Sequence, residues 1–263
     1  MYDLCLAIPK RLRMLVSTLV VVVSFVLLTL VQFTLVPYAS IGYAIVTYAC
    51  VWFALLEDIE GGEWYMLFIL PVALVVSWYL FYYLTPVRWL TRLGGVGILA
   101  ITFYSSISVS NILNVAVVKG LPLFQVAITV SQLTQLFVLY LVMQIFFSFS
   151  LGWGTQMIMV FLYSTLVQTQ HFWAIQLDPA ARRYPYQSYS VLNSILIASI
   201  LGVTSFLPFG SMSVRALLPA GCMYIYSGVV HLHMQKKMYM IYLREYIFAF
   251  ITLLVIFLLV VKW

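Results

Sequence analysis

The stretch at residues 111–140, NILNVAVVKGLPLFQVAITVSQLTQLFVLY, predicts the end of one membrane helix, a tight turn at Lys119-Gly120, and the start of the next helix. It carries amide side chains within otherwise apolar sequence. A polar side chain in the bilayer is costly unless it faces protein or water, so we expect this hairpin to lie inside a helical bundle. We call its five amide residues the amide seam: Asn111, Asn114, Gln125, Gln132 and Gln135.

The spacing within the amide seam allows two interpretations. Asn111 and Asn114 are three residues apart, as are Gln132 and Gln135, so each pair shares a helix face. The seam could line a permeation path or a small polar-ligand site. It could instead form hydrogen bonds between helices, each contributing about 0.6–2 kcal/mol. No acidic residue occurs in the hairpin, which favours the packing interpretation.

The composition predicts an all-α, polytopic membrane protein. Hydrophobic residues make up 65% of the 263 residues and charged residues only 8%, against about 25% charged in soluble domains. One crossing takes roughly 20 residues, so the chain is accounted for by membrane helices in one transmembrane domain, residues 1–263. The 13 Lys and Arg residues are scattered at predicted helix ends, so we expect a lipid bilayer as the main partner and no nucleic acid.

Apolar runs and their interruptions predict nine spans after a cytoplasmic tail at residues 1–13. The segment after the third span, TPVRWLTRLGG, is predicted to be a loop, with Arg88 and Arg92 anchored at the headgroup level. The spans fall in two groups, residues 14–84 and 95–263. The predicted spans are 14–33, 39–56, 64–84, 95–118, 122–149, 153–177, 189–207, 214–234 and 240–261.

The distribution of cations predicts a cytoplasmic N-terminus and an external C-terminus in a bacterial cytoplasmic (inner) membrane. With the N-terminus inside, nine cations lie on the cytoplasmic side and four on the other, as the positive-inside rule requires. The cytoplasmic set is Lys10, Arg11, Arg13, Lys119, Arg182, Arg183, Lys236, Lys237 and Arg244. The external set is Arg88, Arg92, Arg215 and Lys262.

A second candidate site is an interfacial cluster of His231, Arg244 and Glu245 around the turn between the last two spans. A His/Glu set near a membrane face could relay protons or bind a metal ion. However, His231 and His233 are two residues apart and face different sides of a helix. Arg244 and Glu245 are more simply interpreted as headgroup-level residues that pair with a neighbour or a lipid phosphate.

Two further features are candidates for ligand binding. The acidic loop at residues 57–63 could bind Ca²⁺ or Mg²⁺, but its spacing matches no EF-hand and favours a solvated loop or a basic partner. His171 is flanked by Gln168 and Gln170 near the end of a span, where a lone histidine is usually interfacial. The three cysteines show no metal-ligand spacing and are interpreted as packing residues.

Several short motifs resemble an uncharacterised family of multi-pass membrane proteins from candidate-phyla (Patescibacteria-like) bacteria. The resemblance covers residues 94–263. In that family an acid often precedes the first asparagine, whereas Ser110 stands here, which weakens any inference of ion coupling at the amide seam. The resemblance implies no activity. The motifs are Asn111-Ile-Leu-Asn114-Val-Ala116, Leu121-Pro122-Leu123, Arg244-Glu245-Tyr246 and Lys262-Trp263.

These patterns leave three hypotheses for function. The sequence contains no phosphate-binding loop, HExxH or GxSxG motif, so we expect no catalytic residues, cofactor or metal ion. The first hypothesis is therefore a non-catalytic membrane scaffold or complex component, in contact with other membrane proteins. The second is a small permease or channel-like carrier that uses the amide seam for an unidentified small molecule. The third is an intramembrane enzyme acting on a lipid.

Overall fold

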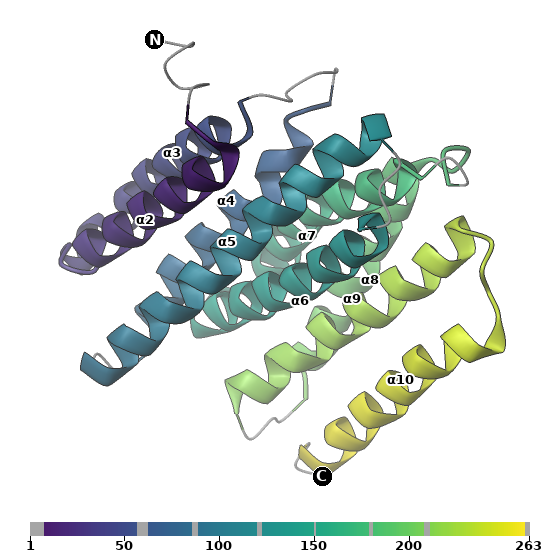
Figure 1. Cartoon of the computed structure of the whole chain (residues 1–263). Helices are drawn as coiled ribbons and strands as arrows, with labels where there is room; N and C mark the ends of the chain where they lie inside the picture. The colour runs from purple at the N-terminus through teal and green to yellow at the C-terminus, as the bar shows by residue number, and fades with distance from the viewer. Residues whose placement is uncertain are drawn as a thin grey trace. The chain divides into compact units, whose positions relative to one another are not determined.

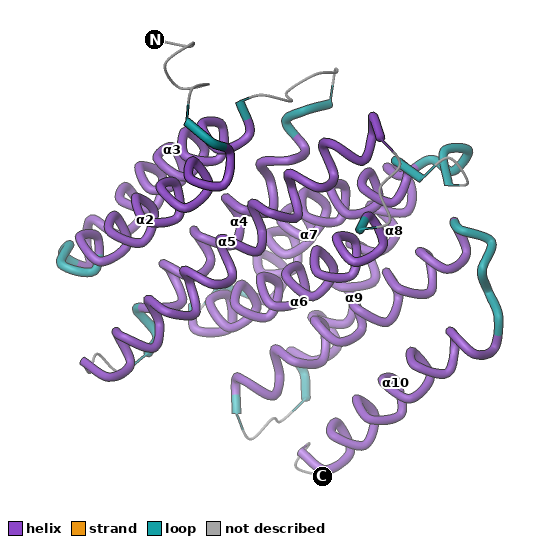
Figure 2. The backbone as a smooth tube through the Cα atoms, viewed as in Figure 1, coloured by secondary structure: helices purple, strands orange, loops and turns teal. Residues whose placement is uncertain are grey.

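The fold is all-helical in the part of the chain that the computed structural model describes, residues 8–56, 63–85, 89–119, 123–149, 151–178, 181–207 and 211–260. This part contains nine α-helices, one 3₁₀ helix and no strand (Figures 1 and 2). The elements are α2 (Lys10–Leu28), η1 (Phe33–Leu35), α3 (Val36–Leu55), α4 (Met66–Tyr82), α5 (Trp89–Lys119), α6 (Phe124–Ser148), α7 (Trp153–Gln176), α8 (Tyr186–Ser205), α9 (Met212–Met234) and α10 (Met240–Val260).

The chain forms two compact units, Met1–Thr134 and Gln135–Trp263, and α6 begins in the first and ends in the second. The first unit is built around α4. Twelve of the 17 residues of α4 are buried, as expected for a helix that is apolar on all sides. Hydroxyl groups join its neighbours to one another: Tyr43 Oη donates to the Val21 carbonyl at 2.9 Å, and Ser17 Oγ donates to the Cys50 carbonyl at 2.8 Å. These bonds fix α3 against α2.

The second unit has a core shared by α6, α7, α8 and α9. Its buried members are Leu139, Met143, Phe147, Val160, Ile197, Leu201, Ala216 and Met223. The last helix, α10, runs antiparallel to α9 (Figure 1) and packs on it at two glycines. The ring of Tyr246 lies directly against Gly228, and a β-carbon built on Gly221 would come within 2.8 Å of Leu253 Cδ1. Small residues at such a contact let two membrane helices approach closely.

The prediction of a multi-pass helical membrane protein is confirmed. The nine α-helices coincide with the nine predicted spans, and seven of them are long and apolar enough to cross a membrane. The other two are α4, which is apolar but only 17 residues long, and α7, which has 24 residues but many polar side chains.

Several predicted boundaries differ from the structure, most of all those of the first and fourth spans. Helix α2 begins at Lys10 rather than residue 14 and ends at Leu28 rather than residue 33, and Arg13, predicted to lie in the tail, is fully buried. Helix α5 begins at Trp89, so residues 89–95 are helical rather than a loop. In this first part of α5, Arg92 Nε donates to Tyr82 Oη at 3.1 Å and joins the helix to the end of α4. Arginine and tryptophan favour the membrane interface, but they are also compatible with a helix.

Candidate functional site

The residues of the amide seam lie in both units. Asn111 is half-buried, Asn114 and Gln132 are buried, and Gln125 is exposed, all within the first unit. Gln135 is fully buried and belongs to the second unit. Its Nε2 donates to Oε1 of Gln170 on α7 at 2.8 Å. The partner of Gln135 is therefore on the following helix rather than within the predicted hairpin.

Residues 168–171 of α7 place four polar side chains around the helix, where they meet α6 and α8. Consecutive residues of an α-helix point in directions about 100° apart, so one short stretch can reach several neighbours. Gln170 accepts from Gln135 of α6, and Gln168 Oε1 accepts from Asn193 Nδ2 of α8 at 2.9 Å. Thr169 Oγ1 lies 2.7 Å from Ser190 Oγ of α8. We call the buried residues Gln135, Gln168, Gln170, His171 and Asn193 the α7 polar layer.

Several atoms of the α7 polar layer are buried without a hydrogen-bond partner. They are Oε1 of Gln135, Oδ1 of Asn193, and both ring nitrogens of the fully buried His171. Buried polar atoms in proteins are nearly always hydrogen-bonded, to protein or to ordered water. Amide oxygens accept, whereas a neutral imidazole offers one donor and one acceptor. Each of these atoms can be satisfied by water or a small polar solute that donates or accepts the hydrogen bond it needs.

The three residues of the interfacial cluster lie in different environments. His231 of α9 is half-buried, its Nε2 is buried without a hydrogen bond, and its ring interacts electrostatically with Lys237, Asp178 and His171. Arg244 and Glu245 are exposed on α10. Glu245 lies near enough to Tyr224 of α9 to interact electrostatically with its hydroxyl group. His231 is thus related to the α7 polar layer, and Arg244 and Glu245 belong to the surface of α10.

The remaining candidates are placed as follows. Residues 57–62 of the acidic loop lie outside the described residues, and Glu63 is exposed. Across the described residues, no group of three or more His, Cys, Asp or Glu side chains is arranged to hold a metal ion. The sequence predicted an interfacial position for His171, whereas the structure buries it fully, and it missed Asn193 of α8. The only signal for Asn193 is that an amide within a membrane helix needs a partner.

No family model, curated protein or solved structure matches this chain. The resemblance over residues 94–263 therefore stays a prediction.

Proposed function

We propose that the protein is a non-catalytic component of a bacterial cytoplasmic membrane complex, where it binds another membrane protein through the outer face of α10. The observation that carries this proposal is the exposure of α10. None of the 21 residues of this helix is buried, although it is long and apolar enough to span the membrane.

The outer face of α10 is a continuous stripe along the helix. It consists of Ile241, Glu245, Phe248, Thr252, Val255 and Leu259, spaced by three and four residues, and all six are exposed. Phe248 is 72% and Leu259 79% exposed. Residues of this spacing share one face of the helix, and Thr252 gives that face a small residue, as helix contacts in membranes often have.

Glu245 adds a chemical requirement to this surface. It lies five residues after the first residue of α10, between Arg244 and Tyr246, and its side chain is exposed. A carboxylate near hydrocarbon is costly unless a cation or a hydrogen-bond donor faces it. We infer that the partner is a transmembrane helix that presents an Arg, Lys or hydroxyl group opposite Glu245.

The test is extraction of the tagged full chain in a mild detergent, followed by affinity purification and measurement of stoichiometry. We expect a companion membrane protein in constant ratio with the wild-type chain. Glu245→Lys should remove it by placing like charges together. The control is Ile247→Ala, an exposed residue of α10 outside the stripe. Recovery of the wild-type chain alone, or retention of the companion by Glu245→Lys, would contradict the proposal.

A second candidate function is that of a carrier for a small polar solute, with the α7 polar layer in place of the amide seam as its site. It is favoured by the unpartnered atoms of Gln135, His171 and Asn193 inside the second unit. In reconstituted vesicles, the wild-type chain should then carry a small polar solute faster than protein-free vesicles. His171→Phe should abolish this flux, and Ser199→Ala, at an exposed position of α8, should preserve it. Equal flux in wild-type and protein-free vesicles would exclude this function.

For topology we propose nine spans with a cytoplasmic N-terminus and an external C-terminus. In support, α4 and α7 together with the seven longer apolar helices make nine helices in the described part of the chain, the number that the prediction requires. Single cysteines placed at Lys236 and at Ser211, which lie at opposite ends of α9, should react with a membrane-impermeant thiol reagent from opposite sides. Labelling from the outside should reach position 211 and not position 236. The reverse pattern would invert the orientation.

A further inference from the structure

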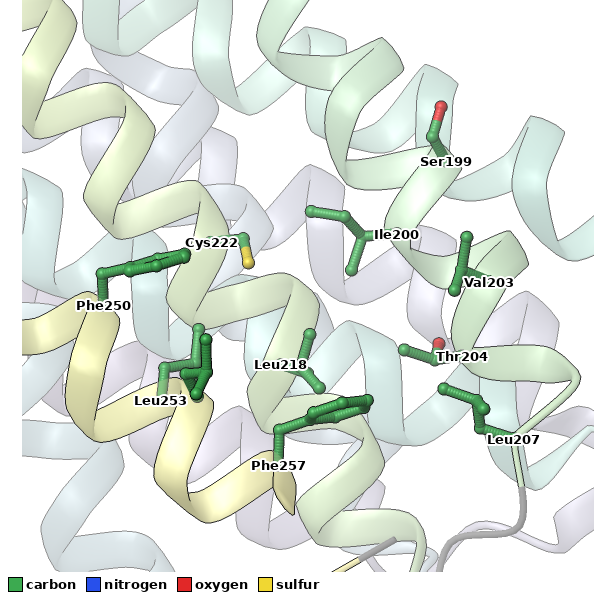
Figure 3. A pocket seen from close by; sticks show the side chains of 11 residues that line it. Ser199, Ile200, Val203, Thr204, Leu207, Leu218, Cys222, Phe250, Leu253 and Phe257 are labelled. Carbon is green, nitrogen blue, oxygen red and sulfur yellow. The ribbon is translucent and has the colours of Figure 1, made fainter.

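A groove of about 310 Å³ lies in the second unit between α8, α9 and α10 (Figure 3). Each of the three helices contributes side chains to its wall. The lining side chains include Val203 of α8, Leu218 and Cys222 of α9, and Phe250 and Phe257 of α10. The groove is separate from the α7 polar layer, none of whose residues lines it.

The lining of the groove offers no free hydrogen-bond donor apart from the weakly polar thiol of Cys222. It includes two hydroxyl groups, and each donates its proton to a carbonyl group of its own helix. Ser199 Oγ donates to the Ile195 carbonyl at 2.8 Å, and Thr204 Oγ1 donates to the Leu201 carbonyl at 2.9 Å. Water needs two to four polar partners, so a space of this kind stays dry and is filled by apolar groups.

The mouth of the groove faces the outer surface of the unit. Val203 is 63% and Phe250 51% exposed, although both line the groove. Helices α8, α9 and α10 are each long and apolar enough to span a membrane. The medium at this mouth is therefore the hydrocarbon of the bilayer.

The dimensions of the groove fit an extended hydrocarbon chain. A cavity of about 150 Å³ accepts one benzene molecule, so this groove has about twice that capacity. From Phe250 to Phe257 it follows α10 for seven residues, which is about 10 Å of helix. A transmembrane helix with its side chains is about 10–12 Å wide and is too thick to enter.

We propose that this groove is a lipid-binding site that holds one acyl chain of a bilayer phospholipid. The acyl chain fills the space between α8 and α10, which are otherwise connected through their packing on α9. A bound acyl chain therefore makes the van der Waals contacts that attach the outer side of α10 to the rest of the unit, because packing contacts hold helices together in a membrane.

The test uses the purified full chain in detergent with dioleoylphosphatidylcholine that carries a photoreactive diazirine on one acyl chain. Crosslinked residues are identified by mass spectrometry of peptides, and stoichiometry by native mass spectrometry. We expect saturable binding of one lipid per chain, with crosslinks concentrated on the lining residues such as Leu218, Cys222 and Phe257.

Two variants and a control make the test decisive. Cys222→Trp fills the groove from α9 and should abolish the crosslink. Val203→Trp blocks the mouth from an exposed position and should also abolish the crosslink. It provides the test if Cys222→Trp does not fold. Ile251→Trp, an exposed residue of α10 outside the lining, should leave the crosslink unchanged. Crosslinks spread evenly over exposed residues, a crosslink that survives in the folded blocking variant, or a second polypeptide seated on the groove would overturn the proposal.

Discussion

The contact between Gly228 and Tyr246 predicts that Gly228→Ala destabilises the second unit. The ring of Tyr246 occupies the space into which the new methyl group would project. Alanine favours a helix over glycine by about 1 kcal/mol, so in open space the same substitution would stabilise. Here the steric conflict is with an aromatic ring, which has few alternative rotamers, and overpacking of a core costs about 1–3 kcal/mol.

The balance of the two effects is a net loss of up to about 2 kcal/mol for Gly228→Ala. For a chain of this size that corresponds to a fall of up to roughly 8 °C in melting temperature. The assay is thermal unfolding of the detergent-purified protein, followed by circular dichroism. Gly97→Ala in α5 is the matched control, because a methyl group there meets nothing within 4 Å and should be neutral or stabilising.

A double-mutant cycle separates the steric conflict from other effects. Tyr246→Ala removes the ring, so Gly228→Ala combined with Tyr246→Ala should cost less than the sum of the two single changes. The expected interaction energy is on the order of 1 kcal/mol. If Gly228→Ala proves as stable as Gly97→Ala, or if the two changes at α9 and α10 are additive, then the close packing at Gly228 is not what joins these helices.

Three other changes test the second unit by thermal unfolding. Gln168→Leu should cost about 1–2 kcal/mol, because it leaves the buried amide of Asn193 unpaired, whereas the double change to leucine at both positions should restore most of that loss. A double variant no more stable than Gln168→Leu would contradict this. His171→Phe should raise the melting temperature, because it removes two buried ring nitrogens that have no hydrogen-bond partner, and a fall would contradict this. Arg215→Leu should lose about 0.5–2 kcal/mol, because its guanidinium lies 4.1 Å from the centre of the Phe147 ring, and an equal loss after Phe147 has been changed to leucine would refute this contact.

The helices could be predicted closely because apolar runs and their charged or proline-containing interruptions are visible in composition alone. The start of α5 could not be predicted, because Arg92 is compatible with both an interfacial loop and a helix. Its hydrogen bond to Tyr82, which favours the helix, is visible only in the structure. In the same way, Arg13 suggested a tail before the first span, although the structure buries it within α2.

The candidate site was only partly predictable for a different reason. Helical spacing shows which side chains share a face, but it does not reveal which helix lies opposite. Gln135 was recognised as a buried amide, whereas its bond to Gln170 depends on how α6 and α7 pack. Asn193 shares a helix face with Ser190, three residues earlier, but that spacing does not show that the two residues meet Gln168 and Thr169 of α7.

The polar character of α7 has a consequence for biosynthesis. This helix carries Gln168, Gln170 and His171 near its end, so it enters a bilayer less readily than its apolar neighbours α6 and α8. We expect its insertion to depend on helices that can bond to its amides, and Asn193 of α8 is synthesised after α7. A change at Asn193 would then reduce the amount of correctly inserted chain in the cell more than it reduces the stability of the chain that is purified.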